Sequence, residues 1–204
     1  MTTLHPEVMP MPLLDRDDSL LVVIDTQPGF YTGRADVDAA VFDAFVGRVA
    51  WLAGAARALE LPVVVLEEEP ERYGPTADAV RAQLPAGTTG LPKEQFGLMG
   101  NPELRGAVER TGRRTAVLAG METDVCVAHS AIGLRDAGWR VAVAVDATYS
   151  PPEAHAHGLD RLRDVGVELL SAKGVLYDWL RSVPAAIDFV ARNPELADPP
   201  GFSL

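Results

Sequence analysis

Short, continuous apolar runs that alternate with longer segments of helical spacing restrict the fold of this chain more than any other feature. A short run without polar interruptions is typical of a strand that is buried on both faces. Strands that alternate with helices of this length indicate a parallel sheet covered by helices on both sides. We therefore predict an α/β fold, a three-layer α/β/α sandwich around a mainly parallel, doubly wound sheet. The strands are expected at residues 20–24, 62–66, 115–119, 141–145 and 167–170, and the main helices at 41–59, 102–110, 124–137 and 153–164.

Capping residues define two of these helices further. Asn101 is the expected N-cap of the helix at 102–110, with a proline at the first helical position. Gly138 is expected to end the helix at 124–137. Tyr177 and Ile187 are expected in two terminal helices.

The length of 204 residues fits one domain, which we expect to span 1–204 with an N-terminal extension at 1–18. The proline-containing tail at 193–204 is expected to be extended, and either loose or in contact with a neighbouring subunit. No apolar stretch approaches the roughly 20 residues that a membrane span requires. The first residues lack the basic and apolar segments of a signal peptide. We expect a soluble cytoplasmic protein without a membrane partner.

The charge and cysteine content exclude further classes of protein. A formal net charge of -11 argues against nucleic acid as a partner, because such proteins need clustered Lys and Arg. A single cysteine excludes an internal disulfide framework and suits a reducing compartment. The sequence contains no glycine-rich nucleotide or phosphate loop. We expect a small-molecule substrate and no cofactor.

The residues that directly follow the predicted strands are the expected location of a site, because open parallel sheets bind ligands at the carboxyl ends of their strands. These segments are 25–27, 67–69, 120–126 and 146–148. Asp25 and Cys126 follow different strands, so we expect them to meet at one edge of the sheet.

Cys126 is the only cysteine and follows a predicted strand and a tight turn. Thr123 is the expected N-cap of the following helix, which places Cys126 in its first turn. Free N–H groups and the helix dipole at that point are expected to lower the thiol pKa and make the sulfur nucleophilic near neutral pH. The alternative is a buried cysteine that behaves as a small hydrophobe.

Asp25 and Lys93 each have a chemical and a structural interpretation. Asp25 is placed to accept the thiol proton and to return it to a leaving group. A turn residue or helix cap after a strand is the alternative for Asp25. Lys93 lies in a loop-like segment between Gly90 and Gly97, where a solvated surface lysine is the ordinary expectation.

Three motifs in one order carry a family resemblance: Asp25-Thr26-Gln27 after the first strand, Pro92-Lys93, and the stretch 120–127 around Cys126. From about residue 20 to about residue 180 the chain resembles the isochorismatase-like cysteine hydrolases, in particular their metal-free isochorismatase-domain subgroup. The resemblance implies a triad of Asp25 as general base, Lys93 as the charge-balancing group and Cys126 as nucleophile.

The resemblance also implies a cis peptide bond between Met121 and Glu122. The main-chain N–H groups of Glu122 and Cys126 would then form the oxyanion hole. Such donors typically contribute about 10²–10³ each to the rate.

Two departures from the family restrict the chemistry. Nicotinamidases carry an Asp-x-His metal site after the second strand, but here no histidine occurs between His5 and His129. We therefore expect no bound metal and no nicotinamidase activity. The acidic run at 67–71 argues against a dicarboxylate such as isochorismate, although a solvated loop is the interpretation we favour for this run.

Several further residues are candidates for the site. Those expected to bind substrate are Gln27, Phe30, Tyr31, Phe96 and Thr123; for the aromatic members the alternative is an ordinary core position, and we favour the pocket because each adjoins a segment of the triad. His129 follows Cys126 by three residues, but we favour a position that points along the helix. A metal site formed by Glu153, His155 and His157 is disfavoured against an exposed helix start.

The leading hypothesis is a cysteine hydrolase that acts on a small amide, carbamoyl or related C–N bond through a thioester acyl-enzyme. Asp25 would protonate the leaving amine and then activate the water molecule. One alternative is an isochorismatase-type vinyl-ether hydrolase, in which Asp25 is essential and Cys126 dispensable. Another is a non-enzymatic ligand-binding or thiol-sensing module. Apolar edges and the long tail suggest a homo-oligomer.

Overall fold

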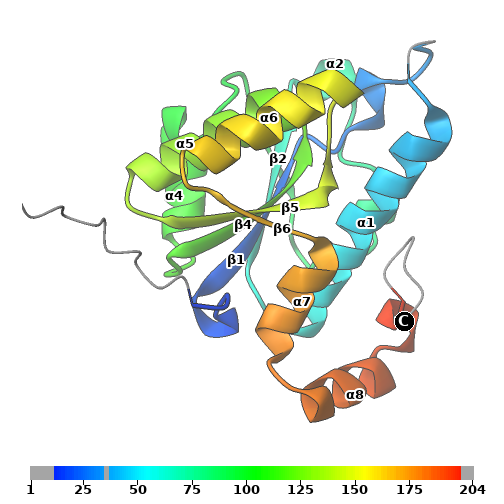
Figure 1. Cartoon of the computed structure of the whole chain (residues 1–204). Coiled ribbons are helices and arrows are strands. Elements are labelled where there is room, and N and C mark those ends of the chain that lie inside the picture. The colour runs from blue at the N-terminus through cyan, green and yellow to red at the C-terminus, as the bar shows by residue number, and fades with distance from the viewer. Residues whose placement is uncertain (1–11, 35–36, 199–204) are drawn as a thin grey trace, which may run out of the picture.

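A computed structural model describes residues 12–34 and 37–198 and contains one six-stranded sheet in which all paired strands are parallel (Figure 1). The strand order is β3-β2-β1-β4-β5-β6. This order reverses direction beside β1, as in a doubly wound sheet, and the predicted α/β sandwich is confirmed. The strands are β1 (Ser19–Ile24), β2 (Val63–Glu68), β3 (Gly90–Lys93), β4 (Thr115–Met121), β5 (Arg140–Tyr149) and β6 (Glu168–Leu170).

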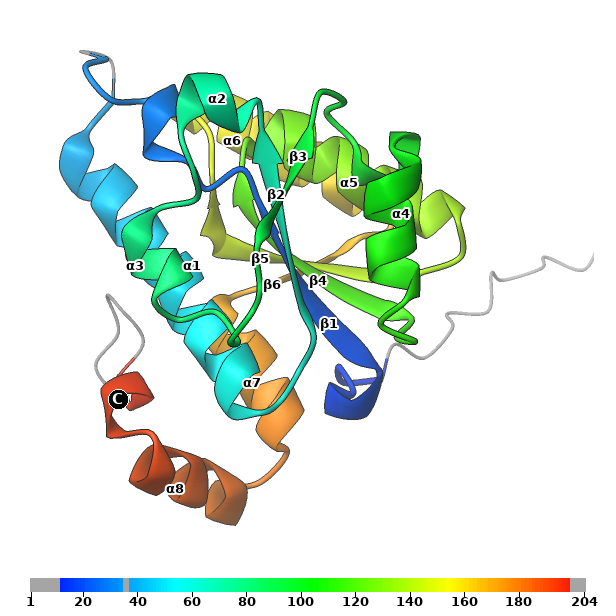
Figure 2. The same ribbon diagram turned by 180° about the vertical axis from the view of Figure 1, so that it is seen from behind.

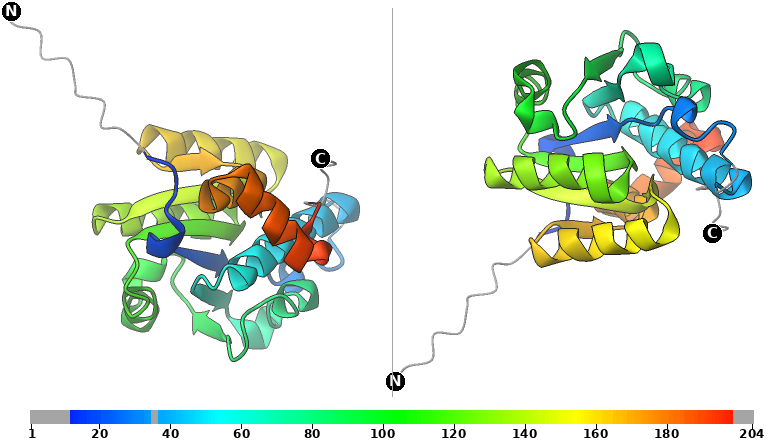
Figure 3. Two further views of the ribbon diagram at one scale, coloured as in Figure 1. Left: turned by 90° about the horizontal axis from the view of Figure 1, so that it is seen from below. Right: turned by 90° about the horizontal axis from the view of Figure 1, so that it is seen from above.

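Helices cover both faces of the sheet and enclose two apolar clusters. The helices α1 (Ala39–Ala58) and α7 (Ala172–Leu180) lie on one face, with α8 (Val183–Arg192) beyond α7 (Figure 3). The opposite face carries α4 (Pro102–Glu109), α5 (Ala128–Asp136) and α6 (Pro152–Asp164). Successive side chains of a strand point to opposite faces, so an apolar run such as β1 supplies both clusters. Full burial of each Val, Leu or Ile side chain contributes about 1.5–3 kcal/mol.

Helix α1 corrects the expectation that no apolar stretch approaches the length of a membrane span. It has 20 residues and is apolar enough to cross a membrane by length and composition alone. In the structure, 56% of its apolar window is buried inside the protein. Phe42, Phe45, Val49 and Leu52 all face the core, as their spacing predicts. The apolar character of α1 is therefore that of a core helix.

Strand β3 was not predicted, because its segment has the composition of a loop. It is short, lies at the edge of the sheet and contains Pro92. An edge strand tolerates proline, since one side of its backbone needs no ladder hydrogen bonds. Two short helices between β2 and β3 were also missed, α2 (Pro70–Tyr73) and α3 (Asp78–Arg81).

The helix predicted at 124–137 is divided in the structure. A π-helical turn (Thr123–Val127) comes first and α5 follows it. The predicted N-cap role of Thr123 is wrong, because its N–H donates to Ser150 Oγ at 2.9 Å and its hydroxyl contacts His155 Nδ1 at 2.8 Å. Gly138 follows the end of α5 with a φ of 84°, so the predicted stop is confirmed. Asn101 caps α4 as predicted, accepting from the Glu103 and Leu104 N–H groups.

The first part of the C-terminal tail packs on its own chain. Residues Pro194–Leu196 form a short 3-10 turn, and Trp51 Nε1 of α1 donates to the Leu196 carbonyl at 3.0 Å. This contact replaces the extended conformation that we expected for this part of the tail. The expectations for residues 1–11 and 199–204 lie outside the described residues.

Candidate active site

The carboxyl ends of three strands carry the predicted triad. Asp25 directly follows β1, Lys93 is the last residue of β3, and Cys126 lies in the turn after β4. Strand β2 separates β3 from β1 (Figure 2), so the Lys93 side chain reaches across β2. Lys93 Nζ is 2.7 Å from Asp25 Oδ2 and 3.5 Å from Cys126 Sγ. The structure therefore brings the three residues together.

The structure adds Glu68, the last residue of β2, to this group. Its Oε2 atom lies 3.0 Å from Lys93 Nζ and accepts a hydrogen bond from Cys126 Sγ at 3.3 Å. Sequence reasoning did not assign Glu68 to the site. A signal was nevertheless present, because Glu68 follows a predicted strand and belongs to a segment expected at the carboxyl edge of the sheet.

Lys93 lies among three groups that can carry negative charge. Oxygen atoms of Asp25 and Glu68 and the Cys126 sulfur lie within 4.8 Å of one another, the only such group of three found in the part of the chain that the structure describes. The Lys93 ammonium group contacts all three and supplies the positive charge there. Burial lowers the pKa of Lys93, but its neighbours, first the Asp25 carboxylate, raise it by more, so the ammonium form persists.

Burial changes the proton affinity of both acids of the triad. It raises the pKa of Asp25 to about 6, against the opposing attraction of Lys93. It also raises the pKa of the Cys126 thiol, and the negative charge of Asp25 raises it further, so that Lys93 does not compensate. The expectation of a lowered thiol pKa is therefore wrong. The thiol is neutral in the free protein and needs an adjacent base to become a nucleophile.

The main chain at Asp25 is held in an uncommon conformation. Its φ of 46° lies in the left-handed region, which costs a residue with a side chain about 1–3 kcal/mol. The Asp25 N–H donates to the Leu66 carbonyl at 3.0 Å, and the Asp25 carbonyl accepts from the Gln27 N–H at 2.7 Å. These bonds fix the position of the carboxylate at the end of β1.

Gln27 has a structural role instead of the predicted substrate contact. Its side chain is buried, and Oε1 accepts from the Glu68 N–H at 2.8 Å. Nε2 donates to the carbonyl groups of Glu68 at 3.0 Å and Gly74 at 2.6 Å. The amide hydrogens therefore join the segment after β1 to the end of β2 and to Gly74 after α2.

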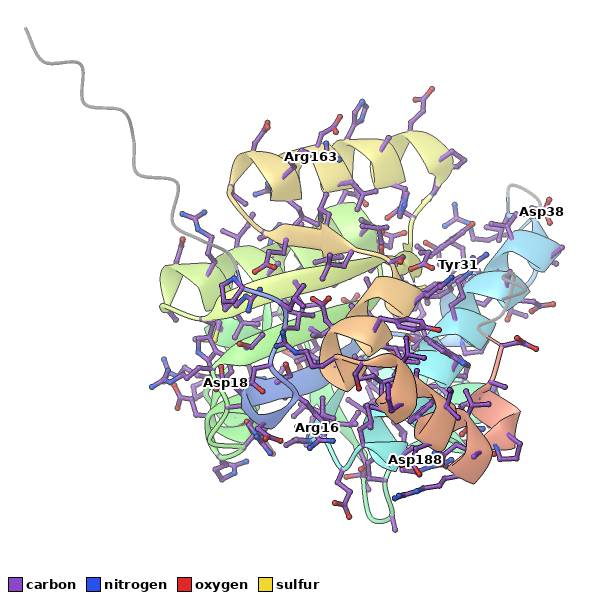
Figure 4. All side chains as sticks on the ribbon, turned by 60° about the horizontal axis from the view of Figure 1, so that its bottom comes forward. Arg16, Asp18, Tyr31, Asp38, Arg163 and Asp188 are labelled. Carbon is purple, nitrogen blue, oxygen red and sulfur yellow. The ribbon has the colours of Figure 1, made fainter. Side chains whose placement is uncertain are left out.

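Glu122 and Tyr31 lie beside the π-helical turn that contains Cys126. The peptide bond between Met121 and Glu122 is cis, at the position that the family resemblance implied. The Glu122 carbonyl accepts from the N–H groups of Val125 and Val127, which places its main chain beside Cys126 in the π-helical turn. The Tyr31 hydroxyl donates to Glu122 Oε1 at 2.5 Å. Figure 4 shows Tyr31, which follows β1, far from Arg16 and Asp18, which precede it.

The other two predicted aromatic residues differ in position. Phe30 is half-buried and stacks on Tyr73 of α2, with ring centroids 3.9 Å apart. Phe96 is 50% exposed and meets His129 edge to face at 5.9 Å. It borders a cavity of about 410 Å³ that contains no member of the triad in its lining. The structure therefore does not bring Phe96 to the triad.

The histidine candidates lie outside the cluster of Asp25, Glu68, Lys93 and Cys126. His129 is exposed, and Glu153 and His157 are exposed on α6. His155 is half-buried against Thr123, and burial lowers its pKa. Thr123 itself is buried with its hydroxyl engaged by His155, so its predicted substrate contact is replaced by a contact between the turn and α6.

The acidic run at 67–71 is only partly the solvated loop that we favoured. Glu67 is buried, and its Oε1 accepts from both the N–H and the hydroxyl of Thr76 at 2.7 Å. Glu68 belongs to the cluster with Asp25, Lys93 and Cys126. Glu69 and Glu71 alone are exposed to solvent.

Comparison with known proteins finds relatives among isochorismatase domain proteins and YcaC hydrolases. The isochorismatase domain model matches residues 19–174. The probable hydrolase YcaC of Escherichia coli K12 is 29% identical over 176 residues, which cover 83% of each chain. Isochorismatase domain-containing protein 2 of Xenopus laevis is 31% identical over 169 residues, which cover 82% of this chain and 78% of the relative.

Solved structures show the same fold. The YcaC gene product of Escherichia coli, described as an octameric hydrolase of unknown specificity, matches with a TM-score of 0.79 and 23% identity, covering 92% of this chain and 94% of that one. YcaC from Pseudomonas aeruginosa with hexane-2,5-diol and covalent acrylamide matches with a TM-score of 0.79 and 23% identity, covering 93% and 96%. The range matched by the isochorismatase domain model contains the strands and the turn that carry the site.

Proposed function

The chain belongs to the isochorismatase family of hydrolases, and from this premise we propose that it is a cysteine hydrolase of small amide, carbamoyl or related C–N bonds. The observation that carries the proposal is the position of Lys93 Nζ, in contact with both the Asp25 carboxylate and the Cys126 sulfur. A nucleophile, a base and a fixed positive charge within contact distance are the parts that nucleophilic acyl transfer requires.

In the first half of the reaction the Cys126 sulfur attacks the substrate carbonyl carbon. Asp25 takes the thiol proton as the S–C bond forms, and the electron pair of the C=O double bond moves to oxygen. The proton then passes from Asp25 to the leaving nitrogen as the C–N bond breaks, which leaves a thioester. The positive charge of Lys93 stabilises the ionised groups throughout, since charges interact strongly in a buried site.

The oxyanion is assigned to the main-chain N–H groups of Glu122 and Cys126. This assignment is supported by the position of Glu122 directly before the π-helical turn and of Cys126 as its fourth residue, because the N–H groups of the first turn of a helix lack intrahelical acceptors. The hydrogen bond from the Tyr31 hydroxyl to Glu122 Oε1 joins this turn to the segment that follows β1.

The neutral resting thiol disfavours the thiol-sensing alternative. A sensor cysteine requires a low pKa and solvent access, whereas the pKa of Cys126 is raised and the residue is 5% exposed. The vinyl-ether alternative requires a dicarboxylate substrate. Glu68 at the sulfur would repel such a substrate, so a neutral or cationic substrate is favoured.

A structural relative has reacted covalently with a small electrophile. YcaC from Pseudomonas aeruginosa is described with covalent acrylamide. Acrylamide captures nucleophiles at its C=C bond and keeps its amide, so this supports a reactive nucleophile and does not identify a substrate.

The test is turnover of a panel of small amides and carbamoyl compounds, followed by mass spectrometry. Cys126→Ala and Cys126→Ser are expected to lower the rate on the best substrate by at least about 10³-fold, because no other residue of the site can form the thioester. His129→Ala, an exposed residue one turn further along, is the control and should retain the rate. A wild-type rate in Cys126→Ala would refute the proposed mechanism.

We also propose that the chain forms a homo-oligomer. The Escherichia coli YcaC structure is described as octameric, which supports this assembly. The apolar surface around α7 and α8 provides an independent physical reason: Leu13, Tyr177, Val183 and Ile187 are 42–72% exposed there and line one cavity of about 850 Å³.

A further inference from the structure

Glu68 is the ionisable residue of the cluster to which the triad chemistry gives no role. Its Oε2 atom contacts both Lys93 Nζ at 3.0 Å and Cys126 Sγ at 3.3 Å. It is also the most accessible of the cluster's ion-paired groups, with 14% of its side chain exposed against 2% for Asp25 and 0% for Lys93. A water molecule that enters from solvent therefore meets the Glu68 carboxylate before that of Asp25.

The position of this carboxylate is fixed from two directions. Gln27 holds the Glu68 main chain on both sides, by accepting from its N–H at 2.8 Å and donating to its carbonyl at 3.0 Å. Lys93 holds the carboxylate itself. Because a buried glutamine holds its main chain and Lys93 holds its carboxylate, the Glu68 side chain has a defined position, unlike a freely moving surface acid.

Acylation of Cys126 changes the surroundings of Glu68 in a specific way. In the free protein the Cys126 sulfur lies 3.3 Å from Oε2, and its one hydrogen can be donated there or to Asp25. Once sulfur carries an acyl group this donor is lost, and a carboxylate oxygen with an unfilled lone pair binds a replacement donor. A water molecule bound there would accept the role of donor to Glu68 and would lie next to the carbon bonded to sulfur.

We propose that Glu68 is a further catalytic residue, the base that activates water for hydrolysis of the acyl-enzyme; this rests on the proposed function. The water oxygen bonds to the thioester carbon as one of its protons moves to Glu68 Oε2. The C–S bond then breaks, and the proton passes from Glu68 to the Cys126 sulfur. The products are a carboxylic or carbamic acid, the neutral thiol and the ionised Glu68. Asp25 serves formation of the acyl-enzyme and Glu68 serves its hydrolysis.

p-Nitrophenyl acetate separates the two halves, because acylation releases a coloured phenolate and hydrolysis sets the steady rate. Glu68→Gln should give a burst that approaches one p-nitrophenolate per chain. A steady rate about 10²-fold below wild type should follow, in the range expected for loss of a general base. Intact-mass spectrometry should find one acetyl group, and peptide mass spectrometry should locate it on Cys126. Asp25→Asn should instead slow the burst.

Two further variants keep the test decisive. Glu71→Gln changes an exposed acid of the neighbouring helix α2 and should behave as wild type. Glu68→Ala with added sodium formate should regain part of the steady rate, because formate can occupy the space of the missing carboxylate.

The outcomes separate the two proposals. An unchanged steady rate in Glu68→Gln, or loss of burst and steady rate together in both Glu68 variants without formate rescue, would overturn the role of Glu68 and leave cysteine acylation standing. Release by wild type no faster than by Cys126→Ala would overturn the proposed function itself, and the role of Glu68 with it.

Discussion

At the scale of single residues, the ionisation of Asp25 determines the pH range in which the proposed chemistry operates. A base must be ionised before it accepts a proton, and burial raises the pKa of Asp25 to about 6. We expect kcat/KM to fall tenfold per pH unit below about pH 6 and to level off above it. The measurement is the pH dependence of kcat/KM on the best amide substrate.

The control for this prediction is an acid of the same region that does not contact the cluster. Glu71→Gln should leave the acidic limb where it is, whereas Asp25→Asn should abolish it together with most of the activity. An acidic limb that remains at the same pH in an active Asp25→Asn enzyme would assign it to another group.

Residue chemistry also explains which site residues could be predicted. Asp25, Lys93 and Cys126 were predicted through the order of their motifs, and the structure brings all three together. Glu68 was missed because an acidic run has the composition of a solvated loop, and composition does not show that β2 extends into it. Gln27 has the polarity of a ligand contact, but its hydrogen bonds to Glu68 depend on strand register that a linear pattern does not contain.

At the scale of secondary structure elements, Gly120 is the residue on which the approach of β1 and β4 depends. It has a φ of 122°, and a Cβ atom there would lie 1.9 Å from the Ile24 carbonyl oxygen. Gly120→Ala should therefore lower the free energy of unfolding by at least about 3 kcal/mol, because both strands would have to separate. Urea unfolding followed by circular dichroism measures this change.

Gly138→Ala is the matched control for the cost of giving a residue with a side chain a positive φ. Gly138 also has a positive φ, of 84°, but nothing lies within 4 Å of a Cβ atom placed there. We expect a loss of about 1 kcal/mol at this position. Equal losses in the two variants would show that conformational strain, and not the contact with Ile24, accounts for the effect.

The elements that sequence could not predict share a physical cause. The buried strands were predicted from their short continuous apolar runs, and α1 from the helical spacing of its apolar residues. Strand β3 contains Pro92 and ends at Lys93, so it has neither a continuous apolar run nor alternation. The π-helical turn was predicted as the start of a regular helix, because only the tertiary contacts of Thr123 with Ser150 and His155 oppose its use as a cap.

At the scale of the whole molecule, the two faces of the sheet differ in how completely they are covered. The side with α7 and α8 leaves large apolar side chains accessible around one cavity. Ile187 is 65% exposed within this surface. If the surface is the contact between copies, Ile187→Lys should lower the mass of the particle measured by size-exclusion chromatography with light scattering.

Val41→Lys provides the comparison, because Val41 is 53% exposed on α1 and lies outside the α7–α8 surface. It should leave the mass unchanged. Dissociation by Val41→Lys alone would move the expected contact to α1, and a monomeric wild-type protein would refute the oligomer proposal.

The protonated state of the Cys126 sulfur has a consequence for the survival of the protein between turnovers. Peroxides and electrophilic metabolites react with thiolates far faster than with thiols. A nucleophile that gives up its hydrogen only when a substrate is in place is thus protected against overoxidation and stray alkylation. The chain has no second cysteine that could form a disulfide with an oxidised Cys126. The low reactivity of the protonated thiol is therefore what we expect to limit irreversible oxidation.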